Sequence, residues 1–207
     1  MTVAIIDYGM SNLGSVSHAL TVLGAAPEIV ERPEQLATAS RIVLPGVGSF
    51  ADGMAHLVDR GWVDAIRDQV AIGKPLLGIC LGMQLLASRG TEGGEIAGLD
   101  LIPGDIVRLS ELGCGLRVPH VGWNSVTGLS DAGPLFEDIP EDTDFYFAHS
   151  YAFLAGESSD VLAYVDYGIP IAAAIGRRHV RGTQFHPEKS SRAGFRLLRN
   201  FLEWQPC

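Results

Sequence analysis

The segment 75–86 constrains the fold of this 207-residue chain more than any other part of its sequence. The apolar run Pro75-Leu76-Leu77 leads into Gly78-Ile79-Cys80-Leu81-Gly82, and the helical pattern Met83-Gln84-Leu85-Leu86 follows. This order predicts a buried strand, a sharp turn with a cysteine at its apex, and a helix, which is the G-x-C-x-G form of a nucleophile elbow. Glycine neighbours leave the sulfur free to project, and the amides that open the helix favour thiolate over thiol.

A second segment supplies the partners that a cysteine nucleophile needs. Gly182-Thr183-Gln184-Phe185-His186-Pro187-Glu188 places a histidine and a glutamate two residues apart at the end of a predicted strand. Cys80, His186 and Glu188 therefore form a candidate catalytic triad of nucleophile, general base and orienting carboxylate. On this interpretation His186 takes the thiol proton, so we expect activity to fall on acidification, when the imidazole is protonated.

Attack on a carbonyl also requires hydrogen-bond donors for the oxyanion. The amide of Leu81, directly after the nucleophile, is one donor by the geometry of the elbow. The second is expected from Pro45-Gly46-Val47-Gly48, where two glycines let the backbone approach closely and reorient. The predicted oxyanion hole therefore consists of Leu81 with Val47 and Gly48.

Composition excludes several classes of function. The formal net charge of −9 argues against a partner with a phosphate backbone, and no apolar run is long enough for a membrane helix. The N-terminus lacks a basic region before its apolar run, so it is interpreted as a first strand and not as a signal peptide. The three cysteines, Cys80, Cys114 and Cys207, match no zinc spacing and indicate a reducing, cytoplasmic compartment. We expect no metal and no cofactor.

The first half of the chain alternates between strand and helix patterns. This alternation predicts a parallel sheet with helices on both faces. The expected strands are 3–7, 27–30, 41–44 and 76–79, and the expected helical segments are 12–23, 54–58 and 62–70.

The second half has short alternating runs separated by turn residues, which predicts antiparallel or mixed strands beside that sheet. The expected strands are 105–109, 117–121, 125–127, 145–151, 161–167, 171–175 and 180–185, followed by a closing helix over 193–204. No repeat or linker interrupts the pattern. We therefore expect residues 1–207 to form a single α/β domain with a mixed, largely parallel sheet flanked by helices.

Several segments together resemble a known family. The motifs Cys80-Leu81-Gly82-Met83-Gln84 and Phe185-His186-Pro187-Glu188 resemble those of class I, triad-type glutamine amidotransferases. A narrower resemblance, from residue 3 to about residue 203, is to the glutaminase subunits of imidazole glycerol phosphate synthase. It rests on Ile6-Asp7-Tyr8-Gly9-Met10, Pro45-Gly46-Val47-Gly48, Pro119-His120-Val121-Gly122-Trp123-Asn124, His149-Ser150-Tyr151 and Lys189-Ser190.

The resemblance implies a reaction and a set of substrate contacts. It implies hydrolysis of L-glutamine to glutamate and ammonia through a thioester on Cys80. It further implies that Gly48, Gln84, Glu92, Ser150 and Tyr151 contact the glutamine. Glu92 would balance the α-ammonium of the substrate, and backbone groups of Ser150 and Tyr151 would meet its carboxylate.

The resemblance also implies a partner, because nothing in the sequence is equipped to use ammonia. In the resembled enzyme a (β/α)₈ cyclase subunit receives it through its barrel and makes imidazole glycerol phosphate and AICAR in histidine biosynthesis. His120, Trp123, Asn124 and Lys189 are candidates for the docking face.

Three other functions remain possible at this level. The chain could be a glutaminase that serves another synthase, such as one for anthranilate or pyridoxal phosphate, although Gly122-Trp123-Asn124 argues against this. It could be a cysteine hydrolase or a stress protein with an elbow cysteine, or a catalytically dead binding module. The His-Pro-Glu segment argues against the second, and intact Cys80, His186 and Glu188 argue against the third.

Overall fold

The computed structural model describes residues 1–205, so Cys207 lies outside the described residues. The strands are β1 (Thr2–Ile6), β2 (Ala26–Val30), β3 (Arg41–Gly46), β4 (Leu76–Cys80), β5 (Arg89–Gly90), β6 (Ile96–Ala97), β7 (Gly104–Arg108), β8 (His120–Thr127), β9 (Thr143–His149), β10 (Tyr151–Ala155), β11 (Val161–Asp166), β12 (Pro170–Arg177) and β13 (Val180–Thr183). The α-helices are α1 (Leu13–Val22), α2 (Phe50–Asp59), α3 (Trp62–Ala71), α4 (Leu81–Gln84) and α5 (Ser191–Glu203). Short 3₁₀ turns are η1 (Pro33–Thr38), η2 (Leu129–Asp131), η3 (Pro134–Phe136), η4 (Ser158–Asp160) and η5 (Pro187–Lys189).

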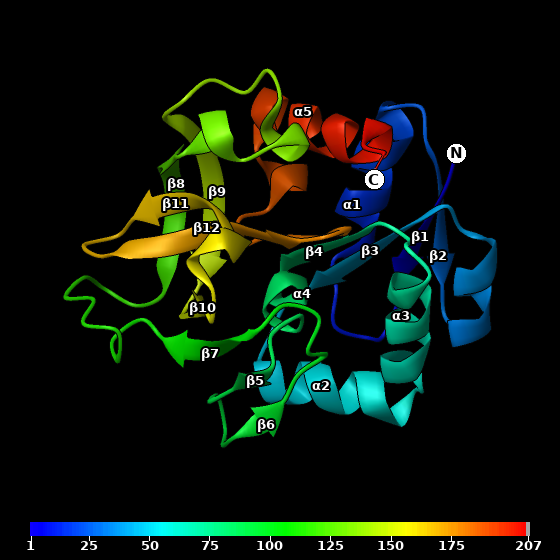
Figure 1. Ribbon diagram of the computed structural model, residues 1–207, viewed down its shortest axis with the longest axis horizontal. Helices are drawn as coiled ribbons and strands as arrows, with labels where there is room; N and C mark the ends of the chain where they lie inside the picture. The colour runs from blue at the N-terminus through cyan, green and yellow to red at the C-terminus, as the bar shows by residue number, and fades with distance from the viewer. Residues whose placement is uncertain (206–207) are drawn as a thin grey trace.

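A nine-stranded mixed sheet in the order β2-β1-β3-β4-β13-β12-β11-β8-β9 forms the frame of the molecule. Its strands from β2 to β13 pair in parallel, and those from β13 to β9 pair antiparallel. Helices α1 and α5 cover one face of the parallel half, and α2 and α3 cover the other (Figure 1). The mixed sheet flanked by helices agrees with the prediction, while the antiparallel half is larger than expected.

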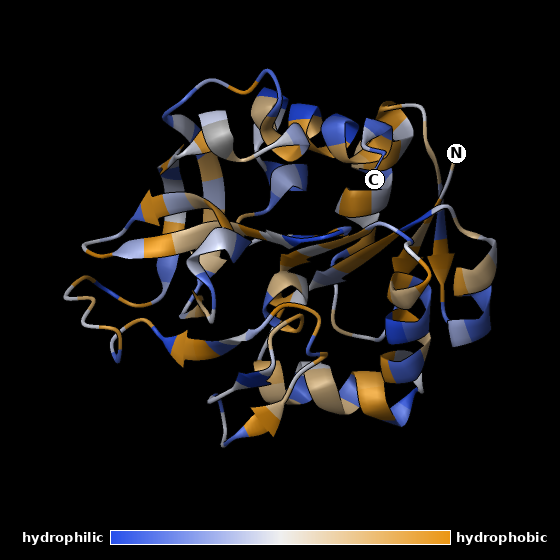
Figure 2. Cartoon of the chain, in the orientation of Figure 1, coloured by the Kyte–Doolittle hydropathy of each residue, from blue (hydrophilic) through white to orange (hydrophobic). Residues whose placement is uncertain are grey.

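Alternation along the buried strands explains how one sheet supports two hydrophobic layers. In β1, Val3 and Ile5 pack with α1 and α5 on one side, whereas Ala4 and Ile6 pack with α2 and α3 on the other. This is the period of two that a strand imposes on its side chains, and burial on both faces requires a continuous apolar run. Strands β1 and β4 are accordingly mainly hydrophobic, while the helices show mixed hydropathy (Figure 2).

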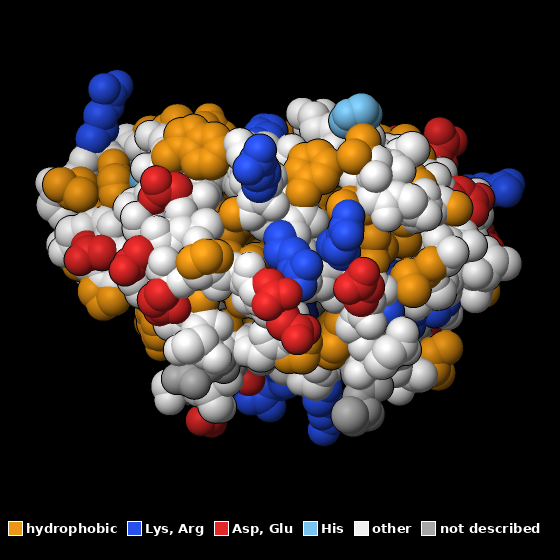
Figure 3. Space-filling model, turned by 90° about the horizontal axis from the view of Figure 1, so that it is seen from above, with side chains coloured by type: hydrophobic (Ala, Val, Ile, Leu, Met, Phe, Trp, Pro, Cys, Tyr) orange, Lys and Arg blue, Asp and Glu red, His pale blue; other side chains and the backbone are white. Residues whose placement is uncertain are grey.

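The outer surface is polar and carries both signs of charge. From above, on the face that carries α5, basic and acidic side chains lie interspersed among apolar ones (Figure 3). An exposed helix face normally combines these classes, because apolar atoms contribute much of any protein surface. Among residues 1–205, no helix is both long and apolar enough to cross a membrane.

Two details of the second half differ from the sequence prediction. The expected strands 117–121 and 125–127 are one strand, β8, whose residues His120 to Val126 all pair with β9. The expected run 145–151 is broken at Ser150, and its continuation, β10, joins a separate sheet in the order β10-β7-β5-β6. That small sheet lies beside α2, below the main sheet in Figure 1. Its two-residue strands β5 and β6 are too short to leave a sequence pattern.

Register brings the ends of three parallel strands to one edge. Gly46 at the end of β3 pairs with Cys80 at the end of β4, and Ile79 pairs with Thr183 at the end of β13. The segments that follow these strands therefore meet in space. Ligands bind at this carboxyl edge in open α/β sheets, so the predicted site residues are gathered where the fold favours a site.

Candidate active site

The turn at Cys80 has the strained geometry of a nucleophile elbow. Cys80 has φ 54° and ψ −110°, an unusual backbone conformation for a residue with a side chain. The flanking glycines are required by space: a Cβ at residue 78 would lie 2.6 Å from the carbonyl oxygen of Gly82. A Cβ at residue 82 would overlap the carbonyl oxygen of Leu44. This turn can therefore form only if residues 78 and 82 are both glycine.

His186 and Glu188 form a close, buried pair beside the cysteine. Nδ1 of His186 lies 2.8 Å from Oε1 of Glu188, and the two side chains are 4% and 2% exposed. A carboxylate can only accept, so Nδ1 carries the proton, and Nε2 is the nitrogen left to meet the thiol of Cys80. Glu188 thereby sets the tautomer of His186.

The environment of His186 changes the expected pH dependence. Burial alone would lower its pKa, but hydrogen bonds to Cys80 and Glu188, together with their charges, raise the pKa to about 9. A pKa in that range favours the imidazolium form of His186 at neutral pH. The expected loss of activity on acidification stays a prediction. With its pKa raised to about 9, His186 loses its proton on the alkaline side of neutral pH.

The backbone of His186 is fixed by the neighbouring strand β9. Its N–H donates to the carbonyl of Tyr146 at 2.9 Å, and its own carbonyl accepts from the hydroxyl of Ser190 at 2.6 Å. The same hydroxyl accepts from the N–H of Tyr146 at 3.0 Å. The position of the predicted base therefore depends directly on where Tyr146 lies.

A cavity of about 390 Å³ opens at the nucleophile. It brings together the predicted oxyanion and substrate residues with Cys80 and His186, while Glu188 lies behind His186. The predicted residues that line it are Val47, Gly48, Cys80, Leu81, Gln84, Glu92, Ser150, Tyr151, His186 and Lys189. Polar groups converge in a concave pocket at the carboxyl edge of the sheet, which is the usual form of a small-molecule site.

The loop after β3 lies at the rim of this cavity. The N–H of Val47 donates to the carbonyl of Met10 at 2.8 Å, so it is engaged away from the nucleophile. Gly48 has φ +112°, in the region that only glycine enters at little cost. The loop therefore holds one predicted oxyanion donor in another hydrogen bond, next to a residue free to change conformation.

Gln84 and Glu92 are both held by hydrogen bonds. Both hydrogens of the Gln84 amide are used, toward the Tyr151 carbonyl at 3.1 Å and toward Oε1 of Gln184 at 3.0 Å. Its own oxygen is the group left for a ligand. Glu92 accepts from the N–H of Phe50 at 2.7 Å, at the start of α2. One oxygen of that carboxylate is thus tied to the helix, and the other remains for a cation.

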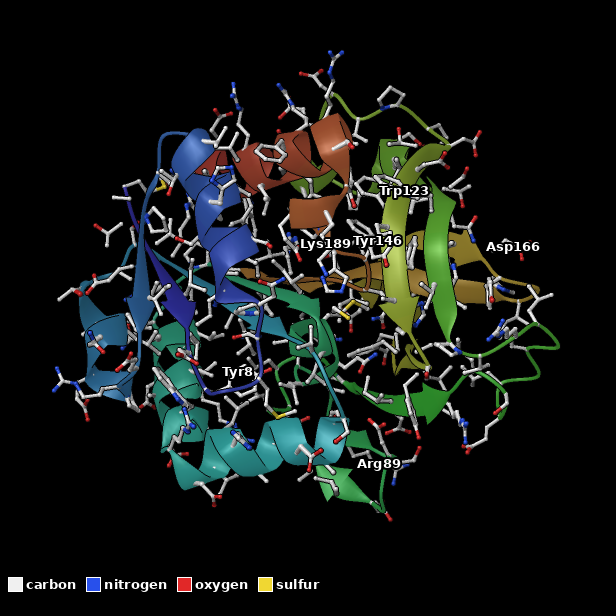
Figure 4. All side chains as sticks on the ribbon, turned by 180° about the vertical axis from the view of Figure 1, so that it is seen from behind. Tyr8, Arg89, Trp123, Tyr146, Asp166 and Lys189 are labelled. Atoms are coloured by element: carbon white, nitrogen blue, oxygen red, sulfur yellow. The ribbon has the colours of Figure 1, made fainter. Side chains whose placement is uncertain are left out.

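The predicted docking residues separate into an outer and an inner set. Trp123 is 53% exposed, packs edge-on against Tyr146 at 6.1 Å between ring centroids, and lies with Lys189 on one side of the molecule (Figure 4). Lys189 holds its ammonium 5.9 Å from the centroid of the Tyr146 ring. His120 is only 3% exposed, and Asn124 is partly buried. Alternation along β8 turns residues 121 and 123 outward and residues 120 and 124 inward.

His120 is the start of a buried polar layer beneath that face. Its ring stacks between Tyr167 and Phe147, and its Nδ1 lies 3.0 Å from Nε2 of His149. Burial lowers the pKa of His120 to about 4 and that of His149 to about 3, so both rings are neutral at physiological pH. Nδ1 of His149 donates to the Tyr151 carbonyl at 2.8 Å.

Sequence reasoning missed two polar residues beside the nucleophile. Gln184 is fully buried and directs its amide nitrogen at the sulfur of Cys80, 3.8 Å away. Tyr8 is fully buried, its hydroxyl has no hydrogen-bond partner among the described residues, and it lies against Gly46. Burial and the charge of Cys80 raise the pKa of Tyr8 far above its usual range. In both cases the sequence feature that could have indicated them is a polar side chain next to the end of an apolar strand. Among residues 1–205, no cluster of side chains could hold a metal ion.

Comparison with known proteins places this geometry in a family. The family model described as glutamine amidotransferase class-I matches residues 4–204. The imidazole glycerol phosphate synthase subunit HisH of Moorella thermoacetica is 51% identical over 97% of this chain and 94% of that relative. The HisH subunit of Desulfitobacterium hafniense strain DSM 10664 / DCB-2 is 48% identical over 98% of this chain and 94% of that relative.

Solved structures agree on the fold. The structure of PurLQS from Thermotoga maritima has a TM-score of 0.77 at 19% identity and covers 97% of both chains. A glutamine amidotransferase crystal structure has a TM-score of 0.76 at 22% identity, also over 97% of both chains. At these identities the likeness concerns the fold alone, and the closer relatives decide between the synthases. The chain belongs to the class I glutamine amidotransferase family and, within it, to the HisH subunits of imidazole glycerol phosphate synthase.

Proposed function

We propose that Cys80, His186 and Glu188 are the triad with which this subunit hydrolyses L-glutamine, and that the ammonia passes to a cyclase subunit. The observation that carries this proposal is the pairing of His186 with Glu188 at 2.8 Å beside a strained elbow cysteine, in a cavity of about 390 Å³. The family supplies the substrate class, and the geometry supports the proposed roles of the residues.

The reaction proceeds in two halves. The thiol proton moves to Nε2 of His186, and the thiolate attacks the carboxamide carbon of glutamine to form a tetrahedral oxyanion. When the C–N bond breaks, His186 returns that proton to the nitrogen, so ammonia leaves and a thioester remains on Cys80. Water then attacks the thioester, again with His186 as base, and releases glutamate and the thiol. Glu188 keeps its charge throughout and stabilises the imidazolium.

Charge on the oxyanion is stabilised by the amide of Leu81 and by a donor from the loop Gly46-Val47-Gly48. In the resting loop the Val47 N–H is bonded to the Met10 carbonyl, so this donor becomes available only when the peptide turns. Loss of one oxyanion donor costs about 2.7–4 kcal/mol, which is roughly 10²- to 10³-fold in rate. A loop that rests in this orientation keeps glutamine hydrolysis slow until a signal turns it.

Glutamine is held by the residues that line the cavity. Oε1 of Gln84 accepts from the substrate, because both hydrogens of that amide are already used. The free oxygen of Glu92 pairs with the α-ammonium, and backbone groups of Ser150 and Tyr151 meet the α-carboxylate. Each of these groups is fixed by a bond to the fold, so little side-chain entropy is lost on binding.

Trp123, Tyr146 and Lys189 form the docking face, with Val121 beside them and with His120 and Asn124 behind it. Aromatic side chains such as those of Trp123 and Tyr146 are enriched at protein interfaces. Because the Tyr146 carbonyl holds the His186 backbone, a partner seated here presses on the strand that positions the base. We propose a (β/α)₈ cyclase as that partner, which makes imidazole glycerol phosphate and AICAR in the cytoplasm. We propose no role for nucleic acid, membrane or cofactor, and a single amidotransferase domain over residues 1–207.

The test is reconstitution with the cyclase subunit. Glutamate release is measured for the free subunit, for the complex, and for the complex with the cyclase substrate, alongside synthesis driven by glutamine or by ammonium salts. We expect a slow free subunit, strong stimulation by the loaded partner, and glutamine-driven synthesis without accumulation of free ammonia. Equal glutamate release in all three states would contradict the loop switch. Absence of glutamine-driven synthesis in an active complex would contradict the function.

A pair of variants at one position separates the loop switch from the triad. Val47→Pro deletes the N–H that the switch requires, so the stimulated rate should fall about 10²-fold or more, while the basal rate changes little. Val47→Ala keeps the N–H and should retain most of the stimulation. A stimulated rate that survives Val47→Pro would remove Val47 from the oxyanion hole.

A further inference from the structure

A single backbone carbonyl, that of Tyr151, orients a buried chain of hydrogen bonds that ends at the sulfur of Cys80. It accepts from Nε2 of Gln84 at 3.1 Å and from Nδ1 of His149 at 2.8 Å. A carbonyl can only accept, so the atom of Gln84 that faces it must be the amide nitrogen. The orientation of the Gln84 amide therefore follows from the backbone.

The orientation of Gln84 decides that of the next amide. The same Gln84 nitrogen lies 3.0 Å from the side chain of Gln184, so the Gln184 atom at that contact must be its oxygen. The nitrogen of Gln184 is then the atom that points at Cys80, at 3.8 Å from Sγ. An N–H of Gln184 is aimed at the nucleophile because no other orientation satisfies the chain.

The surroundings of Gln184 keep it in place. Its side chain is fully buried, Gln84 is 5% exposed, and the backbone N–H of Gln184 donates to the Ala173 carbonyl at 2.8 Å. Next along the chain come Phe185, fully buried, and His186. A hydrogen bond to a charged group is stronger in such a low-dielectric environment than in water. A buried amide that lost its partners would carry a desolvation penalty, so the chain is stable only in this arrangement.

We propose that Gln184 is a catalytic residue whose amide N–H stabilises the thiolate of Cys80, and that Gln84 is the residue that positions it. This inference rests on the proposed role of Cys80 as nucleophile. Gln184 keeps its own proton throughout: the thiol proton goes to His186, and the amide stabilises the charge left on sulfur. If the amide turned over, its oxygen would face the thiolate and repel it. The Tyr151 carbonyl prevents that rotation through Gln84.

Gln184→Met tests this directly, because methionine has a similar length and shape but no donor. The readout is the rate of alkylation of Cys80 by iodoacetamide from pH 5 to pH 10, followed by peptide mass mapping, with Cys114 as internal reference. We expect the pH of half-maximal Cys80 reactivity to rise by about one pH unit, a tenfold change in the acid–base equilibrium. The glutaminase kcat should fall by a similar factor, roughly tenfold, with a smaller change in KM.

Asn200→Leu is the matched control. It also removes a buried side-chain amide, one that donates to the carbonyls of Leu135 and Glu137, but it does so away from the cavity. It should lower stability without moving the Cys80 alkylation profile. If it moves the profile as far as Gln184→Met does, the effect reflects general loosening and the proposal is overturned.

Gln84→Met provides a second test of the proposal, in a variant that keeps the Gln184 side chain. Without Gln84 the Gln184 amide is free to turn over, so the alkylation profile should move in the same direction by a smaller amount. A wild-type profile in a folded Gln184→Met protein, or in Gln84→Met should Gln184→Met not fold, would overturn the inference even if activity is low. Retention of glutaminase activity in Cys80→Ala would instead overturn the proposed function, so the two failures are distinguishable.

Discussion

The elbow and the proposed docking face are built on opposite principles. The elbow lies where buried parallel strands end, every neighbour of Cys80 is packed, and its glycines are required by space. The docking face lies on antiparallel strands, where Trp123 is half exposed and only alternate residues are buried. In the proposed function, the chemistry is therefore fixed by the fold, whereas its control is exposed to a partner. Tyr146 joins the two regions, because its ring lies on the docking face and its carbonyl holds His186.

The largest effect should come from the nucleophile. Cys80→Ala should abolish glutamine-driven synthesis, with a loss on the order of 10⁶-fold, as seen when a triad nucleophile is removed from other enzymes. Ammonium-driven synthesis by the complex should persist, since the docking face is untouched. Cys114→Ala is the control, because that thiol donates to the Tyr167 carbonyl elsewhere in the core. Substantial glutaminase activity in purified Cys80→Ala would show that the elbow is not the catalytic region.

The second-largest effect should come from His186, the proposed general base. His186→Ala should lose roughly 10²- to 10⁴-fold of the glutaminase rate, and Glu188→Gln should lose less, because Glu188 acts only through His186. The pKa of His186 is raised to about 9, so its proton is present at neutral pH and is lost as the pH rises. The wild-type rate should therefore fall as pH increases through about 9.

Glu188→Gln tests the origin of that alkaline limb. Glu188 is one of the groups that raise the pKa of His186, so the limb should move to lower pH in the variant. The measurement is kcat against pH for both proteins. A limb that stays in place would show that Glu188 does not stabilise the imidazolium.

Packing at the elbow gives a stability contrast between the regions. Gly82→Ala places a methyl group on the Leu44 carbonyl, so we expect destabilisation of about 1–3 kcal/mol or more, measured by urea unfolding. Gly115→Ala, in the loop before β8, meets no atom within 4 Å and should change the free energy of unfolding by less than about 0.5 kcal/mol. Equal effects would mean that the elbow is not sterically constrained.

The smallest effect on the isolated subunit should come from the docking face. Trp123→Ala removes a half-exposed side chain, so stability and basal glutaminase activity should change little. Affinity for the cyclase should fall by about 2 kcal/mol, roughly 30-fold, if Trp123 is a hot spot. Titration calorimetry measures the affinity. Arg192→Ala on α5 is the surface control, because Arg192 is exposed and lines a different pocket, with Leu23 and Phe195. Unchanged affinity would show that the docking face lies elsewhere on the molecule.

Local patterns in the sequence predicted much of this molecule. The sequence pointed to Cys80, His186 and Glu188 because the elbow motif and the motif at the strand end each span only a few consecutive residues. Glycine positions and apolar runs likewise predicted the parallel strands. These features depend on short-range sterics and on burial, both of which leave a periodic or compositional trace.

Features that depend on distant partners could not be predicted. Gln184 lies in a segment that the sequence singled out, yet its role depends on Gln84 and Tyr151, which only folding brings to it. The break at Ser150 sends β10 into a second sheet whose two-residue strands are invisible in the sequence. The inward position of His120 could have been predicted. Side chains alternate along a strand, so His120 and the outward Trp123, three residues apart, lie on opposite faces.

The most direct test of the account is covalent trapping of the site in the wild-type subunit. A glutamine analogue that carries an electrophilic ketone in place of the carboxamide is incubated with the protein, and every cysteine peptide is mapped by mass spectrometry. The account predicts one label per chain, on Cys80, blocked by excess glutamine and absent after His186→Ala over the same time. Label on Cys114 or Cys207 at a comparable rate, or label on Cys80 that glutamine does not block, would contradict it.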